Sequence, residues 1–155
     1  EKRQLDSHQH GVSTLKIALE GQSMQMELES PANDIVGFEH APENDKQKAD
    51  IENALSLLKK AAGVFIPSAE ANCIIKENSA EFEIEEGESE IHSGFHVTWK
   101  MTCSNPNQLT NLETNFFKLF PKAEEIEVEI ISASGQKAIE WESDMKKIKL
   151  PASNK

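Results

Sequence analysis

The chain contains 155 residues, with 27 acidic and 16 basic side chains, and its formal net charge at pH 7 is −11. This length fits one domain, and 37% hydrophobic with 28% charged residues is a globular rather than a disordered composition. The acidic balance excludes the basic surface on which nucleic-acid binding depends, and it favours a metal cation or a basic partner. The sequence contains no run of 18 apolar residues, so we expect no membrane span.

We expect a single folded domain over residues 8–150, a flexible N-terminal segment at 1–7 and a C-terminal tail at 151–155. The sequence begins at Glu1 and contains no charged stretch followed by an apolar one. We therefore expect that any signal peptide has been removed or lies outside this sequence.

The first predicted elements are two strands joined by a turn. Apolar residues alternate with polar ones over 15–19 and again over 24–28, with Gly21 between the two runs. This pattern is typical of a hairpin with one buried face. The stretch 31–42 contains turn-forming residues but also apolar ones, so we expect an ordered, partly buried loop.

A helix is predicted over about 45–62. Asn44 and Gln47 have the spacing of a capping box, and apolar residues then recur at helical intervals. Gly63 follows as a stop signal. The opposite face is rich in charged residues and is expected to contact solvent.

Two further strands, 72–86 and 95–103, can place Cys73 opposite Cys103. A disulfide between these residues would stabilise the fold by about 3–4 kcal/mol, and two buried free thiols are the alternative. In the second strand, the period-two alternation puts His96 on the face opposite the apolar side chains.

The rest of the chain completes the predicted fold. The acid-rich stretch 81–90 is expected to form a solvated turn, and a short helix is predicted over about 108–119. A second hairpin is predicted within 126–141 and a short edge strand within 144–150. Together these elements predict an α+β fold of mainly antiparallel strands with two helices and one disulfide.

Five histidines are candidates for binding a metal ion: His8, His10, His40, His92 and His96. His8 and His10 are two positions apart, which puts both rings on one side of an extended segment, although a solvent-exposed pair at the N-terminus is the alternative. His40 lies in the loop with apolar anchors, where it is either a fixed ligand or a surface histidine.

His92 and His96 flank Ser93-Gly94. On a straight strand the two histidines share a face but lie about 13 Å apart. That distance is too long for one zinc ion with bonds of about 2.1 Å. Both can bind one ion only if Gly94 bends the strand, so His96 is the stronger candidate.

No recognisable catalytic motif accompanies these histidines. The sequence lacks HExxH, GxSxG, a P-loop and GxGxxG, so we expect no enzymatic activity. A hydrolase that activates water on a three-histidine zinc site is one alternative. An interaction domain that binds no metal is another.

Short motifs are distributed over about residues 8–142. In chain order they are HGV at 10–12, ELESPA at 27–32, GFEHAP at 37–42, AxC at 71–73, FH at 95–96, TCxNP at 102–106, FP at 120–121 and EIxV at 125–128. This succession resembles the ZrgA-like periplasmic zinc-binding proteins of Gram-negative bacteria. The most specific part of the resemblance is SPA followed by GFEHAP.

The resemblance implies an exported protein that binds Zn²⁺ in the periplasm and assists an ABC-type zinc uptake transporter. Three neutral imidazoles would leave a fourth tetrahedral position, which Glu39 could fill, or Glu39 could accept a hydrogen bond from a ligand. The implied zinc ligands are His10, His40 and His96, with His8 and His92 as secondary candidates.

The segment 81–92 departs from this resemblance. Related proteins often carry a long histidine- and acid-rich insertion there, whereas this segment contains a single histidine, His92. The insertion is therefore either naturally absent or deleted from this sequence. The acidic residues at 77–90 would either raise the local concentration of cations near His92 and His96 or serve only the solubility of the protein.

Overall fold

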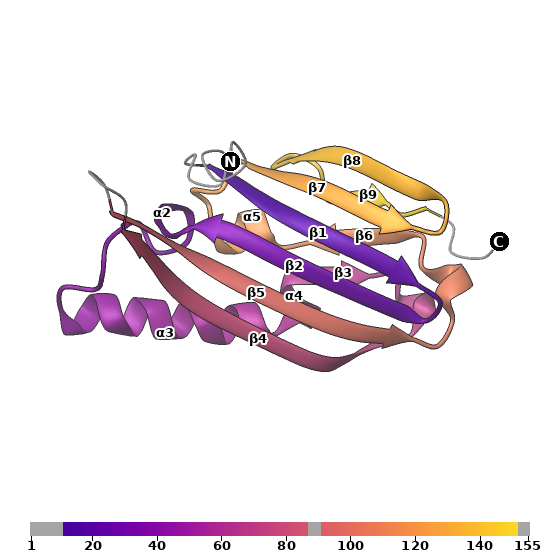
Figure 1. The fold of residues 1–155 in the computed structure, drawn as a ribbon, viewed down its shortest axis with the longest axis horizontal. Coiled ribbons are helices and arrows are strands. Elements are labelled where there is room, and N and C mark those ends of the chain that lie inside the picture. The colour runs from indigo at the N-terminus through magenta and orange to yellow at the C-terminus, as the bar shows by residue number, and fades with distance from the viewer. Residues whose placement is uncertain (1–10, 87–90, 152–155) are drawn as a thin grey trace.

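A six-stranded sheet organises the structure (Figure 1). The computed structural model describes residues 11–86 and 91–151, and its large sheet has the strand order β4-β5-β2-β1-β7-β8. Strands β1 and β7 pair in parallel, and the other neighbouring strands are antiparallel. The strands are β1 (Val12–Glu20), β2 (Ser23–Pro31), β4 (Cys73–Glu86), β5 (Ile91–Cys103), β7 (Glu125–Ser132) and β8 (Gly135–Glu142).

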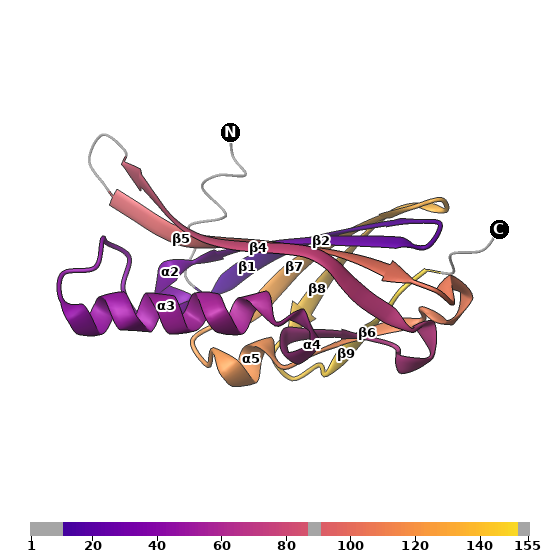
Figure 2. The ribbon, with the colours of Figure 1, turned by 90° about the horizontal axis from the view of Figure 1, so that it is seen from below.

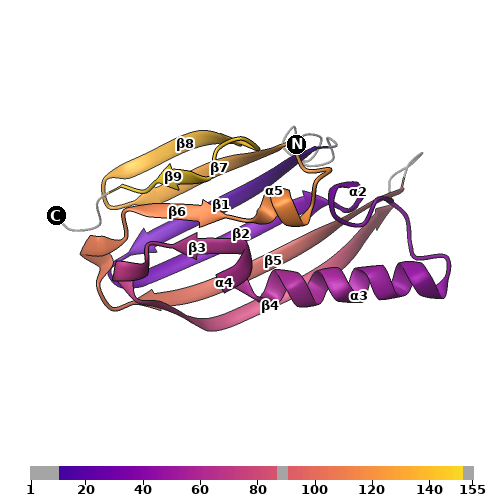
Figure 3. The same ribbon diagram turned by 180° about the vertical axis from the view of Figure 1, so that it is seen from behind.

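A second layer covers one face of this sheet (Figures 2 and 3). It contains the long helix α3 (Asp45–Lys59) and a small sheet with the strand order β3-β6-β9. No helix of the described residues is long and apolar enough to cross a membrane. The remaining elements are β3 (Phe65–Pro67), β6 (Asn111–Thr114), β9 (Lys147–Lys149), α2 (Ala32–Ile35), α4 (Ala61–Val64), α5 (Phe116–Leu119) and 3₁₀ turns at Ala69–Ala71 and Pro106–Gln108.

The core lies between the two layers, because alternate residues of each long strand point toward the helices. In β5, Val97 and Trp99 are fully buried, whereas His96 is half-buried on the other face. Trp99 packs edge to face against Phe65 of the small sheet, and its indole N–H donates to the carbonyl oxygen of Leu58 in α3 at 2.9 Å. This one side chain therefore joins the large sheet to two elements of the second layer.

The predicted α+β class and both predicted hairpins are confirmed. The hairpins are β1–β2 and β7–β8, and the two cysteine-bearing strands are β4 and β5. The parallel pairing of β1 with β7 was not predicted, because these strands are far apart in the sequence and no local pattern reports their contact.

Helix α3 begins as predicted and ends earlier. The side chain of Asn44 accepts a hydrogen bond from the backbone N–H of Gln47 at 2.8 Å, which confirms the N-cap. The backbone leaves the helical region at Lys60, where ψ is 75°, and Ala61–Val64 forms a separate helical turn. The helix therefore ends before Gly63.

The predicted helix at 108–119 is wrong for most of its length. Asn111–Thr114 forms strand β6, and within this segment only Phe116–Leu119 is α-helical. The apolar spacing that suggested a helix does mark buried residues, and Leu112 is fully buried. However, β6 pairs with β3 on one side and β9 on the other, and these tertiary contacts override the local helical pattern.

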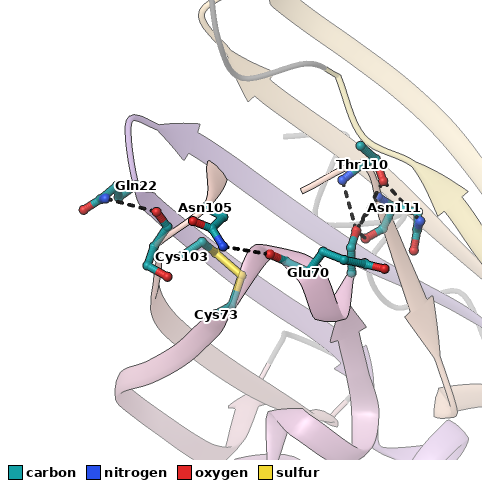
Figure 4. Close-up of a disulfide and its surroundings, with 9 residues drawn as sticks. Gln22, Glu70, Cys73, Cys103, Asn105, Thr110 and Asn111 are labelled. Carbon is teal, nitrogen blue, oxygen red and sulfur yellow. Dashed lines mark hydrogen bonds between the residues drawn. A yellow bond between two sulfur atoms is a disulfide. The ribbon is translucent and has the colours of Figure 1, made fainter. Parts of the chain in front are cut away.

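A disulfide joins Cys73 to Cys103, which lie opposite each other in β4 and β5 (Figure 4). The free-thiol alternative is therefore wrong. Near the disulfide, the side chain of Asn105 donates a hydrogen bond to the carbonyl oxygen of Glu70 at 3.1 Å (Figure 4). The disulfide closes a loop with a sequence separation of 30 residues that contains both strands.

We expect replacement of both cysteines, Cys73→Ser with Cys103→Ser, to lower the free energy of unfolding by about 3–4 kcal/mol, because the unfolded chain regains the entropy of the open loop. Denaturant unfolding of both proteins measures this difference. Full reduction of the wild type, verified by thiol titration, should lower its stability to that of the double variant. Reduced and oxidised wild type of equal stability would contradict the prediction.

Candidate metal centre

His96 lies on the outer face of the large sheet, between two strands that both carry glutamates. Its direct cross-strand neighbours are Glu29 in β2 and Glu81 in β4. Glu27 lies two residues from Glu29 in β2, and Glu83 lies two residues from Glu81 in β4. Side chains on one face of neighbouring strands are close enough to interact directly and diagonally, so all four carboxylates surround the ring.

A β-bulge brings the β4 glutamates to this face. Near the disulfide, Ile75 pairs with Met101, but after the bulge Glu77 pairs with Lys100. This one-residue shift exchanges the faces of all later residues of β4. As a result Glu81 points outward beside His96, while Phe82 packs against Phe95 on the core side.

The His96 ring contacts carboxylates through both of its nitrogens. Nε2 lies 2.5 Å from Oε2 of Glu27, and Nδ1 lies 3.9 Å from Oε2 of Glu83. Two groups of three potential ligands form around the ring, with donor atoms within 4.8 Å of one another. One group is His96 with Glu27 and Glu29, and the other is His96 with Glu81 and Glu83. Imidazole nitrogens and carboxylate oxygens are ordinary zinc ligands.

The surrounding charges alter proton binding at this cluster. Burial lowers the pKa of His96, but the hydrogen bond and charge of Glu27 and the charges of Glu83 and Glu29 raise it, and the net pKa lies above 6.5. Burial also raises the pKa of Glu83 above 4.5; the His96 charge opposes this shift, and a hydrogen bond with Glu81 adds to it. His96 and Glu83 therefore bind their protons more tightly than the same side chains do in water.

A small hollow of about 70 Å³ opens beside His96 at this end of the sheet. His92 lines it together with Glu29, Glu83 and Glu85. Nδ1 of His92 lies 3.8 Å from Oε1 of Glu39, so the loop after α2 reaches β5 here. His92 therefore faces Glu39, and it lies outside both ligand groups around His96.

His40 is held by its own loop. Its ring stacks on Phe38 with a centroid distance of 4.9 Å, and its Nδ1 lies 2.7 Å from the carbonyl oxygen of Ala41. A carbonyl oxygen only accepts hydrogen bonds, so in the neutral ring Nδ1 carries the proton and Nε2 keeps the lone pair. Among the described residues, His40 belongs to no group of three potential ligands within 4.8 Å.

His8 and His10 lie outside the described residues, but the residue that follows them is firmly anchored. The N–H of Gly11 donates to both carboxylate oxygens of Asp34, at 2.8 and 3.0 Å, and Asp34 is only 2% exposed. The Gly11 carbonyl accepts hydrogen bonds from the N–H groups of Glu124 and Glu125. Gly11 is therefore a fixed point at this end of the sheet, and the hydroxyl of Ser13 in β1 donates a hydrogen bond to Ser30, which lines the hollow.

The glutamates around His96 were missed as site residues by the sequence analysis. Residues 81–86 belong to strand β4, which confirms the strand predicted over 72–86 and makes the overlapping prediction of an acidic turn at 81–90 wrong for this part. The available signal was the alternation of Glu81, Glu83 and Glu85, which is typical of one face of a strand. Their partner His96 could not be assigned without the strand register.

The comparison with known protein families gives one match over nearly the whole chain. The family model described as ZrgA family zinc uptake protein matches residues 7–150. No curated protein matches the chain.

Gly94 lies between the two histidines of β5, where the backbone of β2 comes close. A Cβ atom at this position would lie 2.9 Å from the carbonyl oxygen of Ser30. We expect Gly94→Ala to push β5 away from β2 and to cost about 1–3 kcal/mol in the free energy of unfolding. Urea denaturation measures the loss. Gly63→Ala is the control, because no atom lies within 4 Å of a Cβ there; equal effects of the two substitutions would contradict the prediction.

The raised pKa of His96 predicts that the stability of the metal-free protein depends on pH. The folded state binds this proton more tightly than the unfolded state, so the stabilisation is complete below about pH 6.5 and is lost as the pH rises through the folded pKa. Unfolding of wild type and His96→Gln in EDTA, between about pH 5.5 and 8.5, tests this. The stability advantage of the wild type should shrink with rising pH, and an advantage that stays constant would refute the shift.

Proposed function

The chain belongs to the ZrgA family of zinc uptake proteins, and on that premise we propose that it binds Zn²⁺ through His96 on the outer face of the large sheet. We further propose that it does so in the periplasm, as an accessory to an ABC-type zinc uptake system, and without catalytic activity. Zinc is then the cargo of the protein rather than a resident cofactor.

The observation that carries this proposal is the grouping of imidazole and carboxylate donors at His96. Donor atoms of the histidine and of two glutamates lie within 4.8 Å of one another on either side of the ring. A divalent cation would replace the protons that this cluster holds and would relieve the repulsion among its carboxylates. Zinc suits such a mixture of nitrogen and oxygen ligands.

A role in zinc delivery is supported by the exposure of the cluster. The His96 side chain is 27% exposed and that of Glu83 is 53% exposed, so an incoming ligand can reach the ion. A zinc ion with fewer than four protein ligands keeps a coordination position for water or for a donor of a partner. The disulfide supports an oxidising compartment such as the periplasm.

We also propose that a second histidine completes the site, with His10 and His40 as the first candidates and His8 and His92 as secondary ones. Support comes from the way three segments converge at one end of the sheet: Gly11, which follows His10, is anchored there by Asp34, and the loop of His40 reaches β5 through Glu39. The lone pair on Nε2 of His40 suits metal binding, because its Nδ1 is held by a carbonyl group. Glu39 is a fourth ligand or a hydrogen-bond acceptor in this arrangement.

Calorimetric titration with zinc chloride tests the assignment. We expect stoichiometric binding by the wild type, loss of binding in His96→Ala and weaker binding in His40→Ala, because His96 belongs to both groups of candidate ligands whereas His40 would add one further imidazole. Gln136→Ala, at an exposed position of β8 on the opposite edge of the large sheet, serves as the control and should bind like the wild type. Unchanged affinity in both histidine variants would refute the proposed ligands, and a zinc-edge anomalous map of loaded crystals would identify the ion and its ligands directly.

A further inference from the structure

We propose that the ion occupies the β4 side of His96, bound by Nδ1 together with Glu81 and Glu83, and that Glu27 in β2 is a positioning residue that holds the ring. This inference rests on the proposed function, since it specifies where around His96 the zinc ion lies. The opposite arrangement, with the ion between His96, Glu27 and Glu29, is the alternative that the geometry disfavours.

The hydrogen bond to Glu27 determines which nitrogen is available. An ionised carboxylate only accepts hydrogen bonds, so the Nε2 atom that lies 2.5 Å from Glu27 carries a proton. In the neutral ring the lone pair is then on Nδ1. Metal-bound histidines commonly donate their other ring N–H to a carboxylate in this way, which fixes both the tautomer and the orientation of the ring.

The distances on the two sides of the ring support the same assignment. Two zinc ligands with bonds near 2.1 Å at a tetrahedral angle lie about 3.4 Å apart. The 3.9 Å between Nδ1 and the Glu83 oxygen is close to this separation, so an ion fits with a small adjustment. The 2.5 Å between Nε2 and Glu27 leaves no room for an ion, and binding there would first require this hydrogen bond to break.

The strand register also leaves space on the β4 side. Glu81 lies directly opposite His96, and Glu83 lies opposite Gly94. Because Gly94 has no side chain, nothing from β5 stands between Glu83 and the ring. The next outward residues after Glu81 and His96 are Ser79 and Thr98, and their hydroxyl groups are hydrogen-bonded to each other at 2.8 Å. The group of candidate ligands therefore ends at this pair.

The three ligands of this arrangement would leave one tetrahedral position toward solvent. That position is available to His40 from the 36–44 loop or to a donor of the protein that receives the ion. Both carboxylates come from β4, the edge strand of the sheet. The ion would therefore lie at the rim of the molecule.

Zinc titration of four glutamine variants and one glutamine control tests this assignment, with each fold verified by thermal unfolding. We expect Glu81→Gln and Glu83→Gln to weaken binding by more than about 100-fold, and Glu27→Gln by about 10–100-fold, the usual range for a residue that orients a ligand. Glu29→Gln should weaken binding far less than Glu83→Gln. Glu129→Gln in β7 makes the same charge change on the same face outside the hollow, and it controls for the general loss of negative charge.

Imidazole ¹⁵N spectra of the wild type provide a second readout that needs no substitution. With zinc bound, His96 should show metal ligation at Nδ1 and a proton on Nε2. A proton on Nδ1, or a loss in Glu29→Gln equal to that in Glu83→Gln, would overturn the inference while leaving zinc binding intact. A wild type whose His96 resonances do not respond to zinc would instead overturn the proposed function.

Discussion

The pairing of β5 with β2 on one side and β4 on the other is the constraint on which both the core and the metal centre depend. It buries Trp99 against the second layer and leaves His96 on the opposite face, with a glutamate on each neighbouring strand. A slip by one residue would expose Trp99 and bury His96 among apolar side chains. The packing of the core therefore fixes the register of β5 with its two neighbours, and this register places the candidate ligands around His96.

Many of the acidic side chains of this chain lie on the outer face of the large sheet. Beyond the residues around His96, the paired strands β7 and β8 place glutamates opposite one another on the same outer face. Burial raises the pKa of Glu125, and the charges of Glu140, Glu127 and Glu142 raise it further. The negative charge is thus spread across the face rather than confined to residues 77–90. Such a face attracts cations over its whole width, and salt would screen the attraction.

The sequence patterns correctly predicted the elements that depend on interactions between residues close together in the chain. The cap at Asn44 and the alternation in β5 were readable because each depends on neighbouring residues. The helix expected around Leu112 failed, because strand pairing with β3 and β9 outweighs a weak helical pattern. Likewise, the family resemblance indicated zinc and the importance of His96, but the glutamates that surround this ring were read as parts of strands or as a solvated turn.

The sequence by itself determined the fold class and the side of β5 on which His96 lies, because period-two alternation is a property of the chain alone. Only the tertiary structure decided which residues face His96. The bulge after Ile75 reverses the faces of the later part of β4, and without it Glu81 would point toward the core. A bulge arises from the fit between two paired strands and has no fixed sequence signature. The set of residues around His96 therefore depends on the pairing of β4 with β5, which cannot be read from the sequence of either strand alone.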